Sequence, residues 1–80
     1  MFFAVTNVQP LSNYLLRLTF ENGEQKIFDM KPYLETGIFQ GLKDESIFKT
    51  AKVTFDTVEW ANQADIDPET LYHESKALRP

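Results

Sequence analysis

The strongest constraint on the fold is an alternating segment that leads directly into an Asn-Gly pair. Between Tyr14 and Phe20, apolar residues occupy every second position, which is the pattern of a strand with one buried face. Asn22-Gly23 follows, and this pair readily adopts the two positive φ angles of a type I′ turn. The next apolar segment is Gln25–Met30. The sequence therefore predicts an antiparallel hairpin that turns at Asn22-Gly23.

One further strand and a second hairpin are predicted on either side of the first. Phe2–Val8 is rich in β-branched and aromatic residues, and Pro10 ends this strand because proline cannot donate to a sheet ladder. Val53–Phe55 and Val58–Trp60 form the second hairpin around Asp56-Thr57. Two-residue turns in both hairpins predict the opposed pairs Leu18 with Ile27, Arg17 with Phe28, Phe55 with Val58, and Val53 with Trp60.

A short helix and a loop are predicted after the first hairpin. Proline suits a first helical turn, so the segment Pro32–Glu35 is expected to form one or two turns. Gly37 can close this helix with a positive φ, and a loop follows through Gly41. Three apolar residues here are expected to tuck under the sheet: Ile38, Phe39 and Leu42.

Two capped helices complete the predicted elements. Asp44 is a favourable N-cap for a helix over Glu45–Lys52. Asp67 is the N-cap of a C-terminal helix whose first residue is Pro68 and whose apolar anchor is Leu71. The order of elements predicts an α+β fold. Its small, mainly antiparallel sheet has a three-stranded N-terminal meander and a second hairpin, with short helices and a C-terminal helix.

Length and composition exclude several classes of protein. The 80 residues suffice for a single domain, which we place at residues 1–73, followed by a loose tail at residues 74–80. Disulfides are excluded because there is no cysteine, and one histidine makes structural zinc unexpected. The longest apolar run, Met1–Val5, is far shorter than the ~20 residues that span a bilayer. We therefore expect a soluble cytoplasmic protein without a cofactor.

The negative charge is concentrated in one segment. The net charge is −4, and six carboxylates lie between residues 56 and 75 without any lysine or arginine. They are Asp56, Glu59, Asp65, Asp67, Glu69 and Glu74. The rest of the chain therefore carries +2, the difference between −4 and −6. The net negative charge argues against nucleic-acid binding by bulk charge, and the acidic segment is the place to look for a partner.

The acidic segment offers weak candidates for metal binding and catalysis. Asp65, Asp67 and Glu69 have the spacing of the first calcium-loop ligands, but the glycine and the final glutamate of such loops are missing. Glu69 and His73 lie four residues apart on the predicted helix, which without a second histidine favours a surface pair. His73 is also the only usual general base, and no serine lies in a G-x-S-x-G pattern. We expect no metal site, and the question of catalysis stays open, with a non-enzymatic role favoured.

The string from Trp60 to Tyr72, WANQADIDPETLY, carries a family resemblance. Together with FENGE at Phe20–Glu24 and with Phe28-Asp29, it resembles the bacterial domain-of-unknown-function family DUF2442. The resemblance extends from about residue 5 to residue 72. The family usually has a glycine after the asparagine, where this chain has Gln63. If that position requires a positive φ, glutamine is strained there.

The resemblance implies a small α+β domain on an antiparallel sheet, with no established enzymatic activity. Some relatives carry a helix-turn-helix segment after the domain. This sequence ends at Pro80, so we expect neither that segment nor direct nucleic-acid binding. Some relatives are encoded beside a second small family, in an arrangement that resembles toxin–antitoxin pairs.

These observations predict a non-enzymatic protein-interaction module, antitoxin-like or regulatory, that meets a basic protein partner. Its face combines the acidic loop and helix with the aromatic residues that bracket them, a composition suited to protein contacts. The predicted face consists of Trp60, Asn62, Asp65, Asp67, Glu69, Tyr72 and His73.

Two other interpretations stay open. The alternative function is a small-molecule or catalytic site, which would need a pocket and a raised carboxylate pKa. Its lining would be Asp29, Asn62, Asp65 and Asp67. In the third interpretation the loop is structural: Asn62 and Asp65 hold the turn through side-chain-to-backbone hydrogen bonds, Trp60 packs in the core and Tyr72 anchors the helix.

Overall fold

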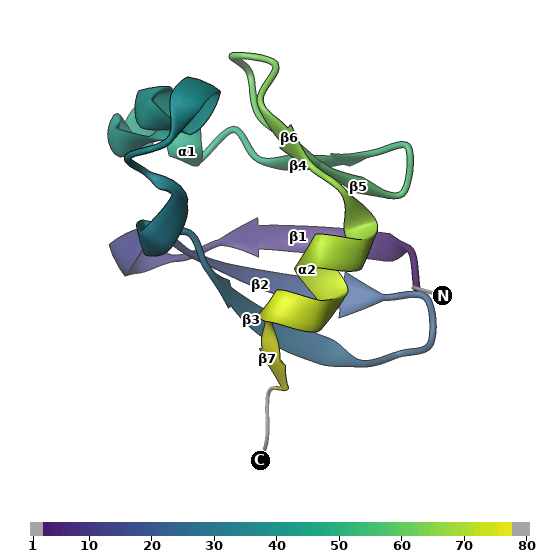
Figure 1. Ribbon diagram of the computed structural model, residues 1–80. Helices are drawn as coiled ribbons and strands as arrows, with labels where there is room; N and C mark the ends of the chain where they lie inside the picture. Colours follow the sequence, from purple (N-terminus) through teal and green to yellow (C-terminus); the bar gives the residue numbers. More distant parts are fainter. Residues whose placement is uncertain (1–2, 78–80) are drawn as a thin grey trace.

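The computed structural model describes residues 3–77, which form two antiparallel sheets and several short helices (Figure 1). The predicted α+β class is confirmed. The strands are β1 (Val5–Pro10), β2 (Leu15–Phe20), β3 (Gln25–Asp29), β4 (Lys52–Thr54), β5 (Thr57–Glu59), β6 (Asp65–Ile66) and β7 (Lys76–Ala77). The α-helices are α1 (Glu45–Phe48) and α2 (Pro68–Glu74), and the 3-10 helices are η1 (Ser12–Tyr14), η2 (Lys31–Tyr33) and η3 (Gly37–Lys43).

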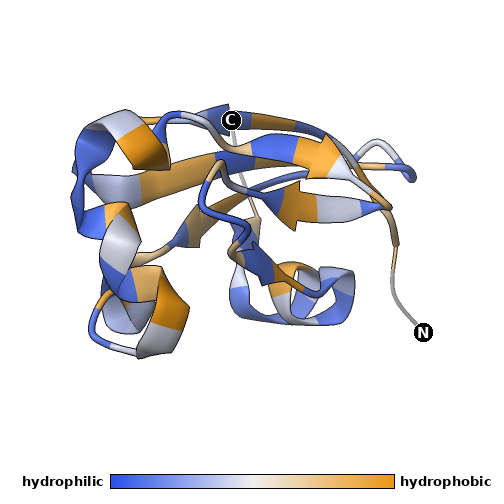
Figure 2. Ribbon diagram, turned by 90° about the horizontal axis from the view of Figure 1, so that it is seen from above, coloured by the Kyte–Doolittle hydropathy of each residue, from blue (hydrophilic) through white to orange (hydrophobic). Residues whose placement is uncertain are grey.

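The first sheet has the strand order β1-β2-β3-β7, and α2 lies across it (Figure 1). Leu16, Leu18 and Phe20 of β2 are buried, as the alternating pattern predicts. In Figure 2 hydrophobic and hydrophilic segments alternate along the strands. The apolar side of this sheet therefore forms one side of the hydrophobic core.

The register of the first hairpin differs from the prediction. The turn contains three residues, 21–23, because the amide of Phe20 bonds to the carbonyl of Glu24 (2.9 Å) and Gly23 has a φ of 90°. Phe28 therefore lies opposite Leu16, and not opposite Arg17 as predicted. The side chains of Leu16 and Phe28 are both buried and lie on the same face of the sheet. The other predicted pair is also wrong: Leu18 lies opposite Lys26, and Ile27 opposite Arg17.

The second sheet has the order β4-β5-β6, and its hairpin also turns earlier than predicted. Phe55 and Asp56 form the turn, with φ values of 48° and 70°. Val53 therefore lies opposite Val58, so both predicted pairs of this hairpin are wrong. Trp60 leaves the β4–β5 ladder because its amide bonds to the carbonyl of Ala64 (2.9 Å).

The core is built around Trp60, which is 1% exposed and donates its indole N–H to the carbonyl of Phe48 (3.0 Å). Edge and stacked ring contacts link six aromatic residues into one chain, in the order Tyr14, Phe48, Trp60, Phe39, Tyr33 and Phe28. This chain of rings joins the first sheet, the 3-10 helices, α1 and the second sheet. The aromatic residues therefore hold together elements that are too short to be stable alone.

The segment between the sheets is more helical than predicted. The loop expected through Gly41 is the 3-10 helix η3, which begins at Gly37 with a φ of 46°. Leu42 is buried and Phe39 is half-buried, but Ile38 is 54% exposed, so the prediction that it tucks under the sheet is wrong. α1 ends at Phe48 rather than at residue 52. Asp44 caps α1 as predicted, accepting from the Ser46 amide (3.0 Å).

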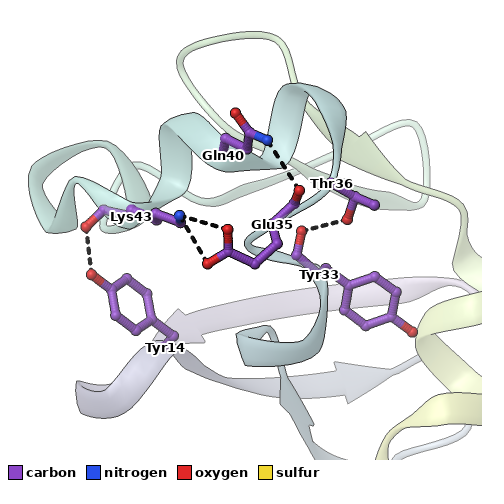
Figure 3. A network of polar contacts seen from close by, with 6 residues as sticks. All are labelled: Tyr14, Tyr33, Glu35, Thr36, Gln40 and Lys43. Carbon is purple, nitrogen blue, oxygen red and sulfur yellow. Dashed lines mark hydrogen bonds and ion pairs between the residues drawn. The ribbon is translucent and has the colours of Figure 1, made fainter.

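A polar network attaches this helical segment to the first sheet (Figure 3). The Lys43 ammonium forms an ion pair with the Glu35 carboxylate (2.9 Å). The side-chain amide of Gln40 donates to the backbone carbonyl of Glu35 (3.0 Å). The hydroxyl of Tyr14 donates to the Lys43 carbonyl. Tyr14 has a positive φ of 61°, so this contact and its ring packing on Phe48 offset a strained backbone.

The two ends of the described chain also differ from the prediction. The first strand is shifted to Val5–Pro10, and residue 2 of the predicted strand lies outside the described residues. Lys76–Ala77 of the expected tail pairs with β3 as β7, while residues 78–80 lie outside the described residues. No helix within residues 3–77 has the length and apolar character to cross a membrane.

Candidate functional site

The loop after β5 is a closed turn held by its own backbone and by Asn62. The Gln63 amide bonds to the Trp60 carbonyl (2.9 Å), and the Asn62 side chain accepts from the Ala64 amide (3.1 Å). The other end of the Asn62 side chain donates to the Ile38 carbonyl (3.5 Å). Asn62 therefore connects the loop to η3, and its role is structural.

Trp60 does not belong on a contact face. Its side chain is buried in the core, which corrects its predicted place on the interaction face. The Thr50 hydroxyl accepts from the Ala61 amide (2.9 Å), so the start of the loop is fixed against the end of α1. Hydrogen bonds therefore hold the loop in place where it leads into β6 and α2.

Asp67 is the N-cap of α2, as predicted. Its carboxylate accepts from the Thr70 amide (3.2 Å) and hydroxyl (2.7 Å), and Pro68 occupies the first helical turn. The Thr70 hydroxyl is the largest influence that lowers the pKa of the Asp67 carboxyl from its ordinary value, and the backbone amide adds to it. A carboxylate with these bonds stabilises the helix and is not poised to exchange protons.

The Asp67 cap predicts a defined pH dependence. Asp67→Ala is expected to lower the free energy of unfolding by about 1 kcal/mol at neutral pH, whereas Asp67→Asn retains most of the cap. Because the folded pKa is lowered, the contribution of Asp67 is complete above the ordinary value of 3.8 and is lost as the pH falls below it. Urea unfolding at pH 7 and at about pH 2.5 measures both variants.

The role of the Asp67 charge is tested by comparing the stability of wild type and of the two variants at both pH values. The stability difference between wild type and Asp67→Ala is expected to shrink at the lower pH. The difference between Asp67→Asn and Asp67→Ala is expected to persist at both values. An equal wild-type advantage at both pH values would contradict the role of the carboxylate charge.

Tyr72 fastens α2 to the first hairpin. The Lys26 ammonium lies 3.7 Å from the centre of the Tyr72 ring and donates to the Tyr72 carbonyl (2.9 Å). The Tyr72 hydroxyl donates to the Glu24 carboxylate. The bond from Tyr72 lowers the pKa of the Glu24 carboxyl, and a bond from the side-chain amide of Asn22 lowers it further. The bond to Glu24 also raises the pKa of the Tyr72 hydroxyl. The tyrosine is half-buried, and its ring also packs against Phe20.

Three members of the predicted face have none of these structural roles. Asp65, Glu69 and His73 are exposed, and the described residues contain no side-chain hydrogen bond or ion pair to Asp65 or Glu69. Asp65 lies opposite Glu59 across the β5–β6 pair, and Glu59 lies opposite Lys52 on β4. Two like charges directly opposite each other repel in the free protein. Glu59 is therefore a neighbour of this face, which sequence patterns alone could not reveal because the pairing of β6 was not predicted.

The alternative site lined by Asp29, Asn62, Asp65 and Asp67 is not assembled. No pocket exists among residues 3–77, and within that range no three potential metal ligands gather. Partial burial acts to raise the pKa of Asp29, but the Lys31 amide and ammonium outweigh it, and the pKa lies below the ordinary value. Asp29 pairs with Lys31 (3.1 Å), while Asp67 caps its own helix. Neither carboxylate has the raised pKa that a general acid would need.

The family comparison agrees with the resemblance. The family model described as "Protein of unknown function (DUF2442)" matches residues 5–77 of the 80-residue chain. The chain belongs to the DUF2442 family. No curated protein and no solved structure matches this DUF2442 member. The family assignment thus supplies no activity for the chain.

The string that carries the DUF2442 resemblance divides into structural and unassigned residues. Eight of its thirteen members are buried or make side-chain hydrogen bonds that hold the loop and helix: Trp60, Asn62, Ala64, Ile66, Asp67, Thr70, Leu71 and Tyr72. Asp65 and Glu69 are exposed and make no such bond within the described chain. Most of the family string therefore has a structural role.

Gln63 departs from the family pattern and occupies a strained position. Its φ is 72°, in the left-handed region where a glycine is free of steric cost. This region costs a side-chain-bearing residue about 1–2 kcal/mol. The glycine that is usual in DUF2442 relatives is thus explained by the backbone of this turn.

Replacing Gln63 with glycine is expected to stabilise the protein. The free energy of unfolding should rise by up to about 1 kcal/mol, because relief of strain exceeds the larger entropy of glycine in the unfolded chain. Urea denaturation measures the change. Gln9→Gly, at an exposed position of β1, is the matched control and should lower stability by about 0.5–1 kcal/mol. Unchanged or lower stability of Gln63→Gly would contradict the strain.

Proposed function

We propose that this protein is a non-enzymatic protein-interaction module whose contact face is formed by Asp65, Glu69 and His73, with Glu59 beside them. The observation that supports the proposal is that Asp65 and Glu69 are exposed with no cation paired to them among residues 3–77. The two described ion pairs, Asp29 with Lys31 and Glu35 with Lys43, involve other carboxylates.

The electrostatics favour a basic partner. Asp65 lies opposite Glu59, and Lys52 on β4 lies opposite Glu59 but not opposite Asp65, so a lysine or arginine of a partner would supply a counter-charge to Asp65. The face lies on β5, β6 and the capped helix α2, which are regular elements of the free protein, so binding requires little ordering. A fixed acidic face with a net charge of −4 behind it would also speed association with a basic protein.

In its specific form the proposal is antitoxin-like: the partner is a small basic protein encoded beside this chain. The test is to purify that neighbouring product and measure its affinity by calorimetry. Asp65→Asn and Glu69→Gln are each expected to weaken binding about 2–5-fold, and the double variant about tenfold. Added salt should weaken wild type more than the double variant.

Glu45→Gln is the matched control. It removes one exposed carboxylate from α1, away from the proposed face, and should leave the affinity unchanged. The absence of binding by the neighbouring product would refute the antitoxin-like form. Equal binding by wild type and by the Asp65→Asn/Glu69→Gln variant would refute the face itself.

A further inference from the structure

The β4–β5 hairpin ends in a phenylalanine that the fold does not use. Phe55 is 96% exposed, while most other aromatic rings of the described chain pack in or against the core. Exposure of so large an apolar surface is unfavourable in water. Covering the ring with an apolar surface of a partner would therefore be favourable.

The backbone at the tip is also unfavourable for phenylalanine. Phe55 and Asp56 both have positive φ values, 48° and 70°, as in a type I′ turn. Asparagine and glycine suit such turns, whereas a bulky residue in the left-handed region is a genuine outlier. Both the side chain and its backbone conformation are therefore locally costly, and local strain of this kind is characteristic of functional positions.

The tip is held in place from two sides. Thr54 and Thr57 pair across the hairpin directly beside the turn. The Asp56 carbonyl accepts from the amide of Val5 (3.0 Å), which is itself buried at the start of β1. In Figure 1 the hairpin tip extends on the side of the molecule where β1 begins. The phenyl ring is consequently presented from a fixed backbone rather than from a loose loop.

We infer that Phe55 is an anchor that inserts into an apolar pocket of a different protein, one whose pocket is bordered by lysine or arginine. The basic border follows from Asp56, an exposed carboxylate adjacent to the ring without a paired cation among residues 3–77. A fixed aromatic side chain that fills a pocket is the usual form of an interface hot spot. This inference does not depend on the proposed acidic face.

Other occupants fit less well. A second copy of this chain would carry the same net charge of −4, so the two copies would repel each other. An anionic membrane surface would repel Asp56 and the net negative charge. Both remain distinguishable outcomes of the experiment below.

The first arm of the test measures stability. Phe55→Asn is expected to raise the melting temperature by a few degrees, because asparagine tolerates the left-handed conformation and exposes less apolar surface. The variant also provides a well-folded protein for binding experiments. A lower melting temperature would mean that Phe55 serves the fold, and it would overturn the inference.

The second arm identifies the occupant in cells of the organism that encodes the chain. Benzoyl-phenylalanine, a photo-crosslinking analogue, replaces Phe55 in the full chain. The same analogue at Ile38, the other exposed large apolar residue among residues 3–77, is the control. The expected result is one adduct with a different protein from position 55 and none from position 38. No adduct, an adduct with a second copy or with lipid, or equal yields at both positions would overturn the inference.

The third arm measures affinity with the crosslinked protein after its purification. Phe55→Asn should weaken binding at least about 30-fold, and Asp56→Asn should weaken it less, by an amount that shrinks in high salt. Wild-type affinity of Phe55→Asn would overturn the inference. The affinity of the Asp65→Asn/Glu69→Gln variant for the same protein separates the two proposals. An unchanged affinity would be consistent with Phe55 as the anchor and would show that the acidic face does not contribute to this complex.

Discussion

Replacing Trp60 with alanine is expected to remove a large share of the stability of the protein. The ring is 1% exposed, contacts Phe39 and Phe48, and bonds to the Phe48 carbonyl. Its removal leaves a cavity where the second sheet meets the helices, at a cost of about 3–5 kcal/mol. A domain of this length has a total stability of only about 4–12 kcal/mol. Urea denaturation followed by circular dichroism measures the loss.

The matched control for Trp60 is Phe55→Ala. Both substitutions truncate a large aromatic side chain of the same small hairpin region, but Phe55 is 96% exposed. Its replacement is expected to change the free energy of unfolding by less than about 0.5 kcal/mol. Similar losses in the two variants would contradict the packing described above. Equal retention of stability would contradict the place of Trp60 at the centre of the core.

Replacing Leu71 with alanine is expected to release α2 from the first sheet. Leu71 is fully buried, and α2 has only seven residues, too few for a helix to be stable in water without tertiary contacts. The substitution should lower the free energy of unfolding by about 2–5 kcal/mol. Amide hydrogen exchange should show loss of protection concentrated in α2 and β7, which follows it in the chain.

Glu74→Ala is the control for Leu71. Glu74 ends the same helix but is exposed, so its replacement should change stability by less than about 0.5 kcal/mol. Uniform loss of protection over all strands in Leu71→Ala would contradict local release of α2. The measurement matters for function because Glu69 of the proposed face lies on this helix.

The elements that were predicted correctly depend on local chemistry. Asp44 and Asp67 cap their helices as predicted, because a carboxylate near the free amides of a first turn needs no distant partner. The alternation from residue 14 to residue 20 predicted the buried face of β2, because the period of a strand is a local property. The usual glycine of the family implied strain at Gln63 only if that position has a positive φ, and its φ is 72°.

The errors concern turn length and distant pairing. Asn22-Gly23 suits a two-residue turn, but the three-residue turn brings Leu16 and Phe28 together on the buried face. The earlier turn at Phe55-Asp56 frees Trp60 for the core and leaves Phe55 in solvent. Local preference alone would not place phenylalanine there, so no sequence signal marked its exposure.

The sequence by itself determined the α+β class, the starts of α1 and α2 and the concentration of carboxylates between residues 56 and 75. Only the tertiary structure decided which of these residues are available. It assigned Trp60 to the core and Asn62 and Asp67 to the loop and helix, and it left Asp65, Glu69 and Phe55 exposed. The physical reason is that caps and alternation depend on neighbours in the chain, whereas burial and register depend on contacts between distant segments.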